Sequence, residues 1–289
     1  MNLPDFEYYA PAGLPEACAL LARFGPQAKV LAGGTDLLVK MKHELVSPAV
    51  LVSLKNLRQL TDIRYEEGRG VVIGALATHN SVAGSPVLQE KYRSVCEAAH
   101  HMANNQVRNR GTVGGNIVNA VPSADLPPIL IALGAFVKLT GSGGERVLPL
   151  EDFFSGPGKT VIAGDEILTE VVIPGRNFTG STYYKFGLRR SGALAVVGVA
   201  AAVEMDGDVC RDARIVLGAV APVPMRAKKA EELLKGRAVT EALLEEAGRC
   251  AAGESRPISD IRGSAEYRRD MVRVFTKRAL RKAIKEGHS

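Results

Sequence analysis

Two glycine pairs, far apart in the sequence, constrain this 289-residue chain more than any other feature. The first lies in residues 31–38, which read LAGGTDLL, and the second in residues 111–125, which read GTVGGNIVNAVPSAD. Glycine has no Cβ, so a ligand can come close to its backbone and its N–H groups can face an anion. Backbone amides of this kind can bind the pyrophosphate of a dinucleotide without a cationic side chain. We therefore predict that the two segments together form one anion-binding site.

Polar side chains beside the glycine pairs suit the same site. Thr35 offers a hydroxyl donor, and we expect the Asp36 side chain to cap the following turn. Thr112 and Asn116 flank the second pair, and Asp125 lies far enough beyond it to accept a hydrogen bond from a ribose hydroxyl. The alternative is that both pairs are only tight turns, the commoner use of glycine. Neither pair has Rossmann or P-loop spacing, so spacing alone supports only anion-binding loops.

The composition is that of a globular chain with a large core and more than one domain, since 46% of the residues are hydrophobic. No apolar run is long enough for a membrane span and no signal peptide is recognisable, so we expect a cytoplasmic location. The net charge of +6 is concentrated in the last stretch, from Tyr267 onward. We interpret this stretch as the solvated face of a docked helix. Nucleic-acid binding is the alternative, and the 5% aromatic content and the absence of tryptophan count against it.

The cysteines and histidines give no metal-binding pattern. Cys18, Cys96, Cys210 and Cys250 are far apart and form no C-x-x-C motif. This spacing argues against an iron–sulfur cluster or a structural zinc site in the chain, so we predict no metal site. The adjacent pair at 100–101 is interpreted as part of a polar helix face.

The apolar pattern predicts an α+β protein in three parts. Residues 1–56 contain a helix that starts at Pro15 and strands at 29–32 and 49–54. Residues 57–175 contain a hairpin and three further strands around a helix at 89–102, and residues 176–289 contain strands followed by helices. The remaining predicted elements are strands at 63–65, 70–74, 135–140, 146–149, 167–173, 181–186, 194–204 and 211–219, and helices at 226–235, at 241–252 after a Thr240 cap, and at the basic end of the chain.

Several segments, taken in order, resemble the flavin-carrying medium subunit of the molybdenum hydroxylases. This family contains xanthine dehydrogenase, carbon monoxide dehydrogenase and 4-hydroxybenzoyl-CoA reductase. The resemblance covers nearly the whole chain, and as an ordered set the segments are highly specific. They are residues 32–37, 74–79, 107–116, 122–125, 185–186 and 257–269.

The resemblance implies that FAD is the cofactor. It implies a two-part FAD-binding domain of the vanillyl-alcohol-oxidase type, with an N-terminal subdomain (1–56) and a middle subdomain (57–175). A C-terminal α+β domain (176–289), with a small sheet and helices, would cover the isoalloxazine ring. Carried over position by position, the resemblance implies the following cofactor-binding residues: Leu31, Ala32, Gly33, Gly34, Thr35, Asp36, Leu37, Thr78, His79, Met102, Ala103, Val107, Gly111, Thr112, Gly114, Gly115, Asn116, Ala124, Asp125, Leu168 and Lys185.

Within this implied site, residues 32–37 and 112–116 would hold the pyrophosphate and Asp125 the adenosine ribose. Leu168 and Lys185 would lie beside the flavin ring, where the Lys185 ammonium could stabilise an anionic reduced flavin. Val107 would line the cofactor pocket. For His79 the resemblance leaves two roles open, contact with the flavin or structural support.

The resemblance also implies an electron relay. Substrate would react at molybdenum in a large partner subunit, and electrons would pass through two-iron clusters of a small partner subunit to this chain's FAD and on to an acceptor such as NAD or quinone. A dimer of heterotrimers is expected. We expect no additional four-iron cluster in this chain, because Cys96 is the single cysteine in residues 39–149. The alternatives are a stand-alone flavin oxidoreductase, for which no acid–base pair stands near the glycine segments, and a non-catalytic flavoprotein scaffold.

Overall fold

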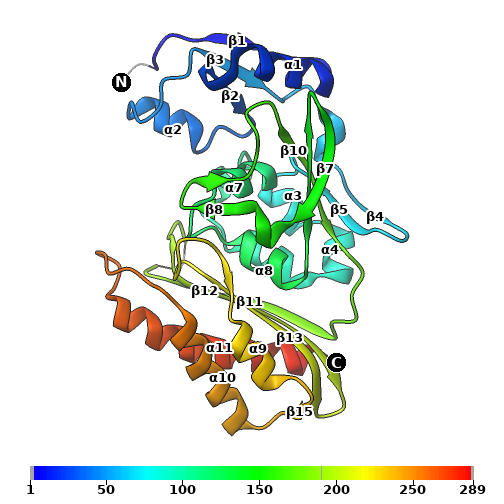
Figure 1. Cartoon of the computed structure of the whole chain (residues 1–289), viewed down its shortest axis with the longest axis vertical. Coiled ribbons are helices and arrows are strands. Elements are labelled where there is room, and N and C mark those ends of the chain that lie inside the picture. Colours follow the sequence, from blue (N-terminus) through cyan, green and yellow to red (C-terminus); the bar gives the residue numbers. More distant parts are fainter. Residues whose placement is uncertain (1–2, 190, 288–289) are drawn as a thin grey trace.

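The computed structural model describes residues 3–189 and 191–287 and arranges them in three successive parts, each built around its own sheet. The parts follow one another down the long axis of the molecule, with the first at the top of Figure 1 and the third at the bottom. Strands and helices occur in every part, so the predicted α+β class is confirmed.

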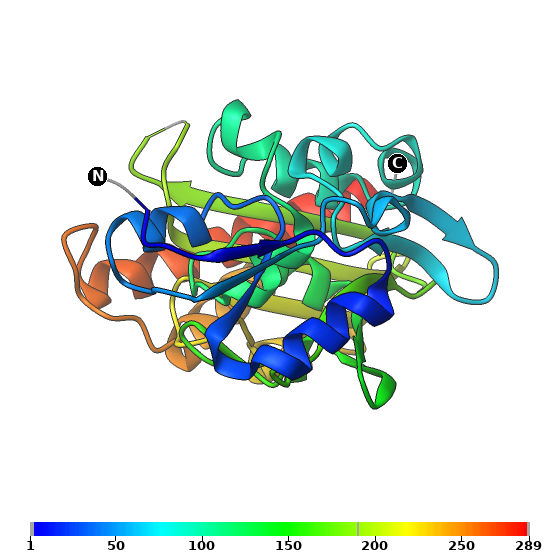
Figure 2. The same cartoon turned by 90° about the horizontal axis from the view of Figure 1, so that it is seen from above.

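The first part is a three-stranded parallel sheet of order β1-β3-β2, with α1 packed on it. Seen from above, in Figure 2, this sheet and α1 lie over the other two parts. The helix α1 has Pro15 in its first turn and ends at Gly25, where φ is +53, as the sequence predicts. Its buried face consists of Ala17, Cys18 and Leu21. The elements are β1 (Glu7–Tyr9), α1 (Leu14–Phe24), η1 (Gly25–Gln27), β2 (Ala28–Leu31), α2 (Leu37–Lys42) and β3 (Val50–Ser53).

The middle part is an antiparallel sheet of order β4-β5-β10-β6-β7, together with short helices that fill the core. All the strands predicted for it are present, within one or two residues at their ends. The elements are η2 (Arg58–Thr61), β4 (Ile63–Glu66), β5 (Gly70–Gly74), α3 (His79–Ala83), α4 (Pro86–Lys91), α5 (Arg93–His100), α6 (Asn105–Arg108), α7 (Val113–Asn119), α8 (Leu126–Ala132), β6 (Phe136–Gly141), β7 (Gly144–Pro149), η3 (Leu150–Phe153), β8 (Phe154–Gly156), β9 (Lys159–Thr160) and β10 (Ile167–Ile173).

The helices of this part differ from the prediction. The single helix predicted at 89–102 is wrong, because the chain leaves the helical conformation at Tyr92 (φ −147°, ψ 60°) and α5 ends at His100. Four helices, α3, α6, α7 and α8, were not predicted. The first two are only five and four residues long. Glycine or proline lowers helix propensity at the start of α7 and α8, and every residue of α8 is buried, so no polar face marks it as helical.

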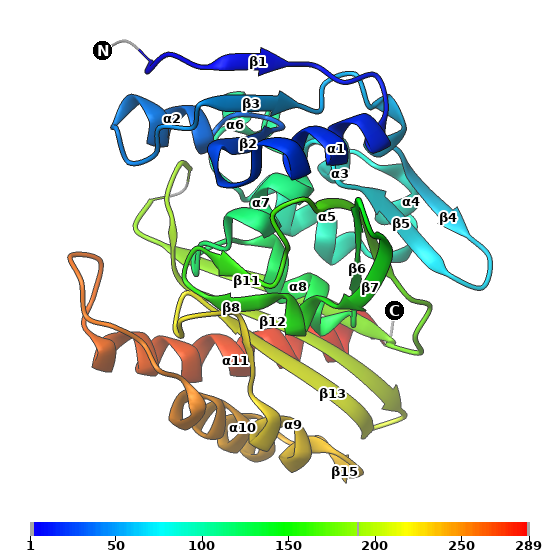
Figure 3. The same cartoon turned by 45° about the horizontal axis from the view of Figure 1, so that its top comes forward.

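The third part is an antiparallel sheet of order β11-β12-β13-β14, with β15 paired to β13. The middle part's α8 packs against β12 and β13 from one side, whereas α11 packs against β11 and β12. Because β12 is covered on both faces, its first nine residues are buried and consist mainly of valine and alanine. Figure 3 shows α10 and α11 at the end of the molecule away from the first part. The elements are β11 (Gly180–Gly187), β12 (Ala195–Asp206), β13 (Val209–Gly218), β14 (Met225–Arg226), α9 (Lys228–Leu234), β15 (Arg237–Ala238), α10 (Glu241–Glu254) and α11 (Ala265–Gly287).

The basic terminal segment forms the docked helix that the sequence predicts. Its buried stripe includes Val272, Ala279 and Leu280, and several of its cations form ion pairs with Glu241 and Glu245 of α10. Thr240 caps α10 through a hydrogen bond from the N–H of Leu243, also as predicted. Among residues 3–189 and 191–287, no helix combines the length and the apolar character that a membrane span requires.

Candidate functional site

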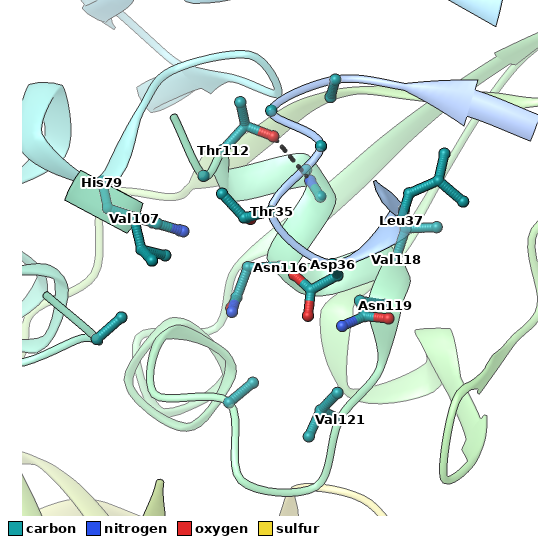
Figure 4. A pocket seen from close by; sticks show the side chains of 18 of the residues that line it. Thr35, Asp36, Leu37, His79, Val107, Thr112, Asn116, Val118, Asn119 and Val121 are labelled. Atoms are coloured by element: carbon teal, nitrogen blue, oxygen red, sulfur yellow. Dashed lines mark hydrogen bonds between the residues drawn. The ribbon is translucent and has the colours of Figure 1, made fainter. Parts of the chain in front are cut away.

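A cavity of about 690 Å³ lies where the first part meets the middle part and the hairpin between β11 and β12. Both glycine segments contribute to its wall, although the chain separates them by most of the middle part. Figure 4 shows Thr35, Asp36, Asn116 and Asn119 beside the same space. The cavity volume falls within the range typical of cofactor sites.

The first glycine segment lines the cavity and has unpaired backbone N–H groups. It connects the end of β2 to the start of α2, and Gly34 has φ +74°, a conformation that favours glycine. In the part of the chain that the structure describes, the N–H groups of residues 33–36 have no hydrogen-bond partner. A Cβ on Gly33 would lie 1.9 Å from the carbonyl oxygen of Arg110, so this glycine also lets two backbones meet. The segment therefore has the unpaired amides that an anion-binding loop needs, and it is packed against the start of the second segment.

The predicted capping role of Asp36 is wrong. Asp36 stands at the N-cap position of α2, but its side chain accepts no capping hydrogen bond. Its backbone is near the helical region (φ −106°, ψ −48°) rather than in the extended conformation from which N-cap side chains reach the first turn. The carboxylate instead forms part of the cavity wall.

The second glycine segment is a helix start rather than a loop. Thr112 is the N-cap of α7 and accepts a hydrogen bond from the N–H of Gly115 at 3.1 Å, drawn dashed in Figure 4. The N–H of Gly114 donates to the carbonyl oxygen of Ala75 at 2.8 Å. A Cβ on Gly114 would lie 2.9 Å from that same oxygen. Glycine at 114 thus serves close packing against Ala75, and its amide is already occupied.

Two buried polar atoms in the cavity wall have no partner among the described residues. They are Nδ1 of His79 and Oδ1 of Asn116. Buried polar atoms are nearly always hydrogen-bonded in folded proteins, so unpaired ones in a cavity wall indicate a ligand that supplies the missing bonds. These two atoms would be paired by a polar ligand lying between α3 and α7.

The imidazole of His79 is kept neutral by its surroundings. The residue begins α3 and is only 3% exposed. Burial lowers the pKa of His79 to about 4, and the positive charge of Arg108 adds to this effect. At neutral pH the ring therefore has one N–H and one lone pair to offer.

Asp125 links the cavity to the third part. Its carboxylate accepts hydrogen bonds from the hydroxyl of Tyr183 at 2.8 Å and from Nζ of Lys185 at 2.7 Å, both on β11. Lys185 also donates to the carbonyl oxygen of His101 at 3.2 Å. Burial raises the pKa of Asp125, while the lysine and tyrosine favour its ionised form. The same carboxylate that lines the cavity is thus also a partner in a buried ion pair.

Most of the residues expected to bind the cofactor line this cavity. The exceptions are Leu31, Thr78 and Lys185, each of which stands next to or bonds to a lining residue. Further lining residues were missed by the sequence analysis, some of them inside the segments 74–79 and 111–125 that it had singled out. They are Lys29, Val30, Lys40, Val46, Leu54, Ala75, Leu76, Asn104, Val118, Asn119, Val121, Ser123, Gly158, Ile162, Glu166, Ile167, Gly192, Ala193 and Leu194.

Comparison with known families identifies the group to which this architecture belongs. Residues 4–176 match the model of the FAD-binding domain in molybdopterin dehydrogenase, and residues 182–283 match that of the carbon monoxide dehydrogenase flavoprotein C-terminal domain. The chain belongs to this family. Its members are oxidoreductase subunits, and FAD is their cofactor.

Similar proteins match over almost their full lengths. The carbon monoxide dehydrogenase medium chain of Hydrogenophaga pseudoflava is 38% identical, with 97% of each chain covered. The nicotine 6-hydroxylase medium subunit of Paenarthrobacter nicotinovorans is 35% identical over 97% of this chain and 98% of its own. The putative xanthine dehydrogenase FAD-binding subunit of Escherichia coli is 31% identical, again with 97% of each covered.

Solved structures agree with this assignment. A chain of the Hydrogenophaga pseudoflava carbon monoxide dehydrogenase superposes with a TM-score of 0.95 at 38% identity, covering 99% of both chains. A chain of quinoline 2-oxidoreductase from Pseudomonas putida 86 gives 0.94 at 33% identity, covering 100% of both.

The cavity residues fit FAD. The amides of residues 33–36 match the pyrophosphate in chemistry, and the unpaired atoms of His79 and Asn116 offer polar contacts. Apolar side chains such as Leu168 and Leu194 provide surfaces for the rings of the cofactor.

Proposed function

We propose that this chain is the FAD-carrying electron-transfer subunit of a molybdenum hydroxylase, exchanging electrons between a partner's iron–sulfur clusters and an external acceptor such as NAD or quinone. The observation that carries the proposal is a cofactor-sized cavity in an FAD-binding fold, with unpaired amides in its wall. When bound, FAD supplies the redox chemistry, and the protein binds and orients it.

The first glycine segment carries the central role in this proposal. The N–H groups of residues 33–36 bind the pyrophosphate, assisted by the hydroxyl of Thr35. The second segment contributes through the side chain of Asn116, while Thr112 orders the first turn of α7. Gly33 allows the first segment to approach the backbone of Arg110 and Gly111. The division of the chain at residues 56 and 175 stays a prediction. Asp125 as a ligand of the adenosine ribose also stays a prediction, and it competes with the proposal below, because the 2.7 Å ion pair puts Asp125 at the same end of the cavity as Lys185.

At the flavin end, we propose that Lys185 acts together with Asp125. The 2.7 Å ion pair fixes the ammonium just behind the cavity wall, so the flavin would experience a paired charge rather than a free one. The paired ammonium still favours an anionic reduced ring. Lys185→Met is expected to lower the midpoint potential of the bound flavin, and an unchanged potential would refute this role.

The partners proposed for the chain are a large subunit with a molybdenum cofactor and a small subunit with two-iron clusters, assembled as a dimer of heterotrimers in the cytoplasm. Support comes from the relatives, which are described as medium chains or medium subunits. In this arrangement, substrate chemistry belongs to the partners, and the chain described here contributes the flavin site.

The first experiment is a visible spectrum of the purified full-length chain with and without added FAD, with bound cofactor released and identified. Stoichiometric FAD without iron or molybdenum is the expected result. Dye reduction by the assembled complex but not by the chain alone would support the relay. Dye reduction by the chain alone, with a small substrate, would support a stand-alone oxidoreductase instead. Flavin binding without dye reduction by the complex would point to a scaffold.

A further inference from the structure

A lysine and an asparagine that the sequence analysis missed meet across the cofactor cavity. Nζ of Lys40, in α2 of the first part, donates to Oδ1 of Asn119, the last residue of α7, at 2.6 Å. Both residues line the cavity, and both are partly exposed to it. The hydrogen bond therefore joins the two helices that follow the two glycine segments.

The charge of Lys40 is not cancelled by a carboxylate. Of the acidic groups in the cavity wall, Asp125 pairs with Lys185 and Glu166 pairs with Arg146. Asp36, at the N-cap position of α2, lies four residues before Lys40, yet no ion pair joins them among the described residues. The partner of Lys40 is a neutral amide, so its full charge remains available to a ligand.

The direction of the side chain places this charge near the anion-binding loop. Side chains on a helix lean toward its N-terminus, and α2 starts directly after the unpaired amides of residues 33–36. Figure 4 shows Asp36 and Asn119 beside the same space. We propose that Lys40 is the cation that binds the FAD pyrophosphate and that Asn119 is the positioning residue that holds its ammonium in place. This inference rests on the proposed FAD site and adds to it a specific charged contact.

The test compares FAD affinity among matched variants of the full-length chain, measured by flavin fluorescence on apoprotein. Lys40→Met is expected to weaken binding about tenfold, while Lys40→Arg, which keeps the charge, stays within about twofold of wild type. Lys42→Met is the control. Lys42 lies on the same helix and is exposed, but it does not line the cavity, so this variant removes the same charge away from the proposed site. Raising the salt concentration from about 0.05 to about 0.5 M should shrink the Lys40→Met effect, because ions screen the contact.

Substitutions at Asn119 separate charge from positioning. Asn119→Asp places a carboxylate beside the ammonium, so it should cancel the charge and weaken FAD binding at least as much as Lys40→Met. Asn119→Ala keeps the charge of Lys40 but removes the hydrogen bond that positions its ammonium. We therefore expect FAD affinity to fall about threefold, less than in the aspartate variant.

Distinct outcomes separate this inference from the function on which it rests. If the wild-type chain and its complex bind no FAD, the proposed function itself fails. If wild type binds FAD and Lys40→Met binds it equally well, only the role of Lys40 is overturned. Equal losses of FAD affinity in Lys40→Met and Lys40→Arg would also overturn the role of Lys40, since the side chain would then act through packing and not through its charge. Thermal midpoints of the apo variants, compared with Lys42→Met, identify any loss due to unfolding.

Discussion

The buried His79 should make the stability of the apoprotein depend on pH in a defined window. Burial and Arg108 lower its pKa to about 4 in the folded state, whereas an unfolded chain has a histidine pKa of about 6.5. Between these values the unfolded state binds more protons, so stability rises with pH. The contribution is fully present above about pH 6.5 and is lost as the pH falls to about 4.

The two pKa values give the size of the effect. Between pH 7 and pH 5, the proton linkage of this single group amounts to about 2 kcal/mol of unfolding free energy. Chemical denaturation of wild type and His79→Gln at pH 7, 6 and 5 would measure it, because glutamine is similar in size and does not titrate. Groups elsewhere titrate in both proteins and cancel in the difference. The free-energy difference between the two proteins should therefore shift by about 2 kcal/mol over this range. Parallel pH profiles would show that His79 is not kept neutral by the fold, and the reasoning would be refuted.

Two further predictions concern backbone packing and the buried ion pair. Gly33→Ala should lower the thermal midpoint and abolish FAD binding, because its Cβ would lie 1.9 Å from the Arg110 carbonyl oxygen. The control is Gly253→Ala, in open space on α10, which should leave FAD binding intact and the thermal midpoint unchanged or slightly raised. Retention of FAD by Gly33→Ala would contradict the packing argument. Lys185→Met should lower the free energy of unfolding by about 3 kcal/mol near pH 7, because it leaves the Asp125 carboxylate buried without its cation. In urea denaturation, the double variant Asp125→Asn/Lys185→Met should recover much of this loss. A double variant no more stable than Lys185→Met would argue against charge burial as the cause.

Local signals predicted much of the fold. Alternating or continuous apolar runs located the longer strands, and Pro15, Gly25 and Thr240 marked helix ends through known capping chemistry. The failures have physical causes. The break at Tyr92 carries no glycine or proline, and α8 is buried on every side, so neither a turn residue nor an amphipathic stripe reveals them.

The candidate site was predictable where a motif marks it and not where contacts are formed only by folding. The hydrogen bond from Lys40 to Asn119 joins residues 79 positions apart, and the pair of Asp125 and Lys185 joins residues 60 apart. Lysine and asparagine on short helices are ordinary surface residues in sequence terms. Only the packing of the first and third parts on the middle part brings these groups together.

The two glycine pairs show most directly what sequence spacing leaves undetermined. They look equivalent as anion-binding loops, yet the amides of residues 33–36 are unpaired, whereas Gly114 donates to Ala75 and Gly115 to Thr112. A large residue at Gly114 would collide with Ala75, so loss of FAD in Gly114→Val would report a damaged helix–strand contact as readily as a blocked pyrophosphate. Lys40→Met avoids this ambiguity, because the lysine reaches the cavity through a flexible side chain. The cofactor contact can thus be tested without altering the backbone packing that shapes the site.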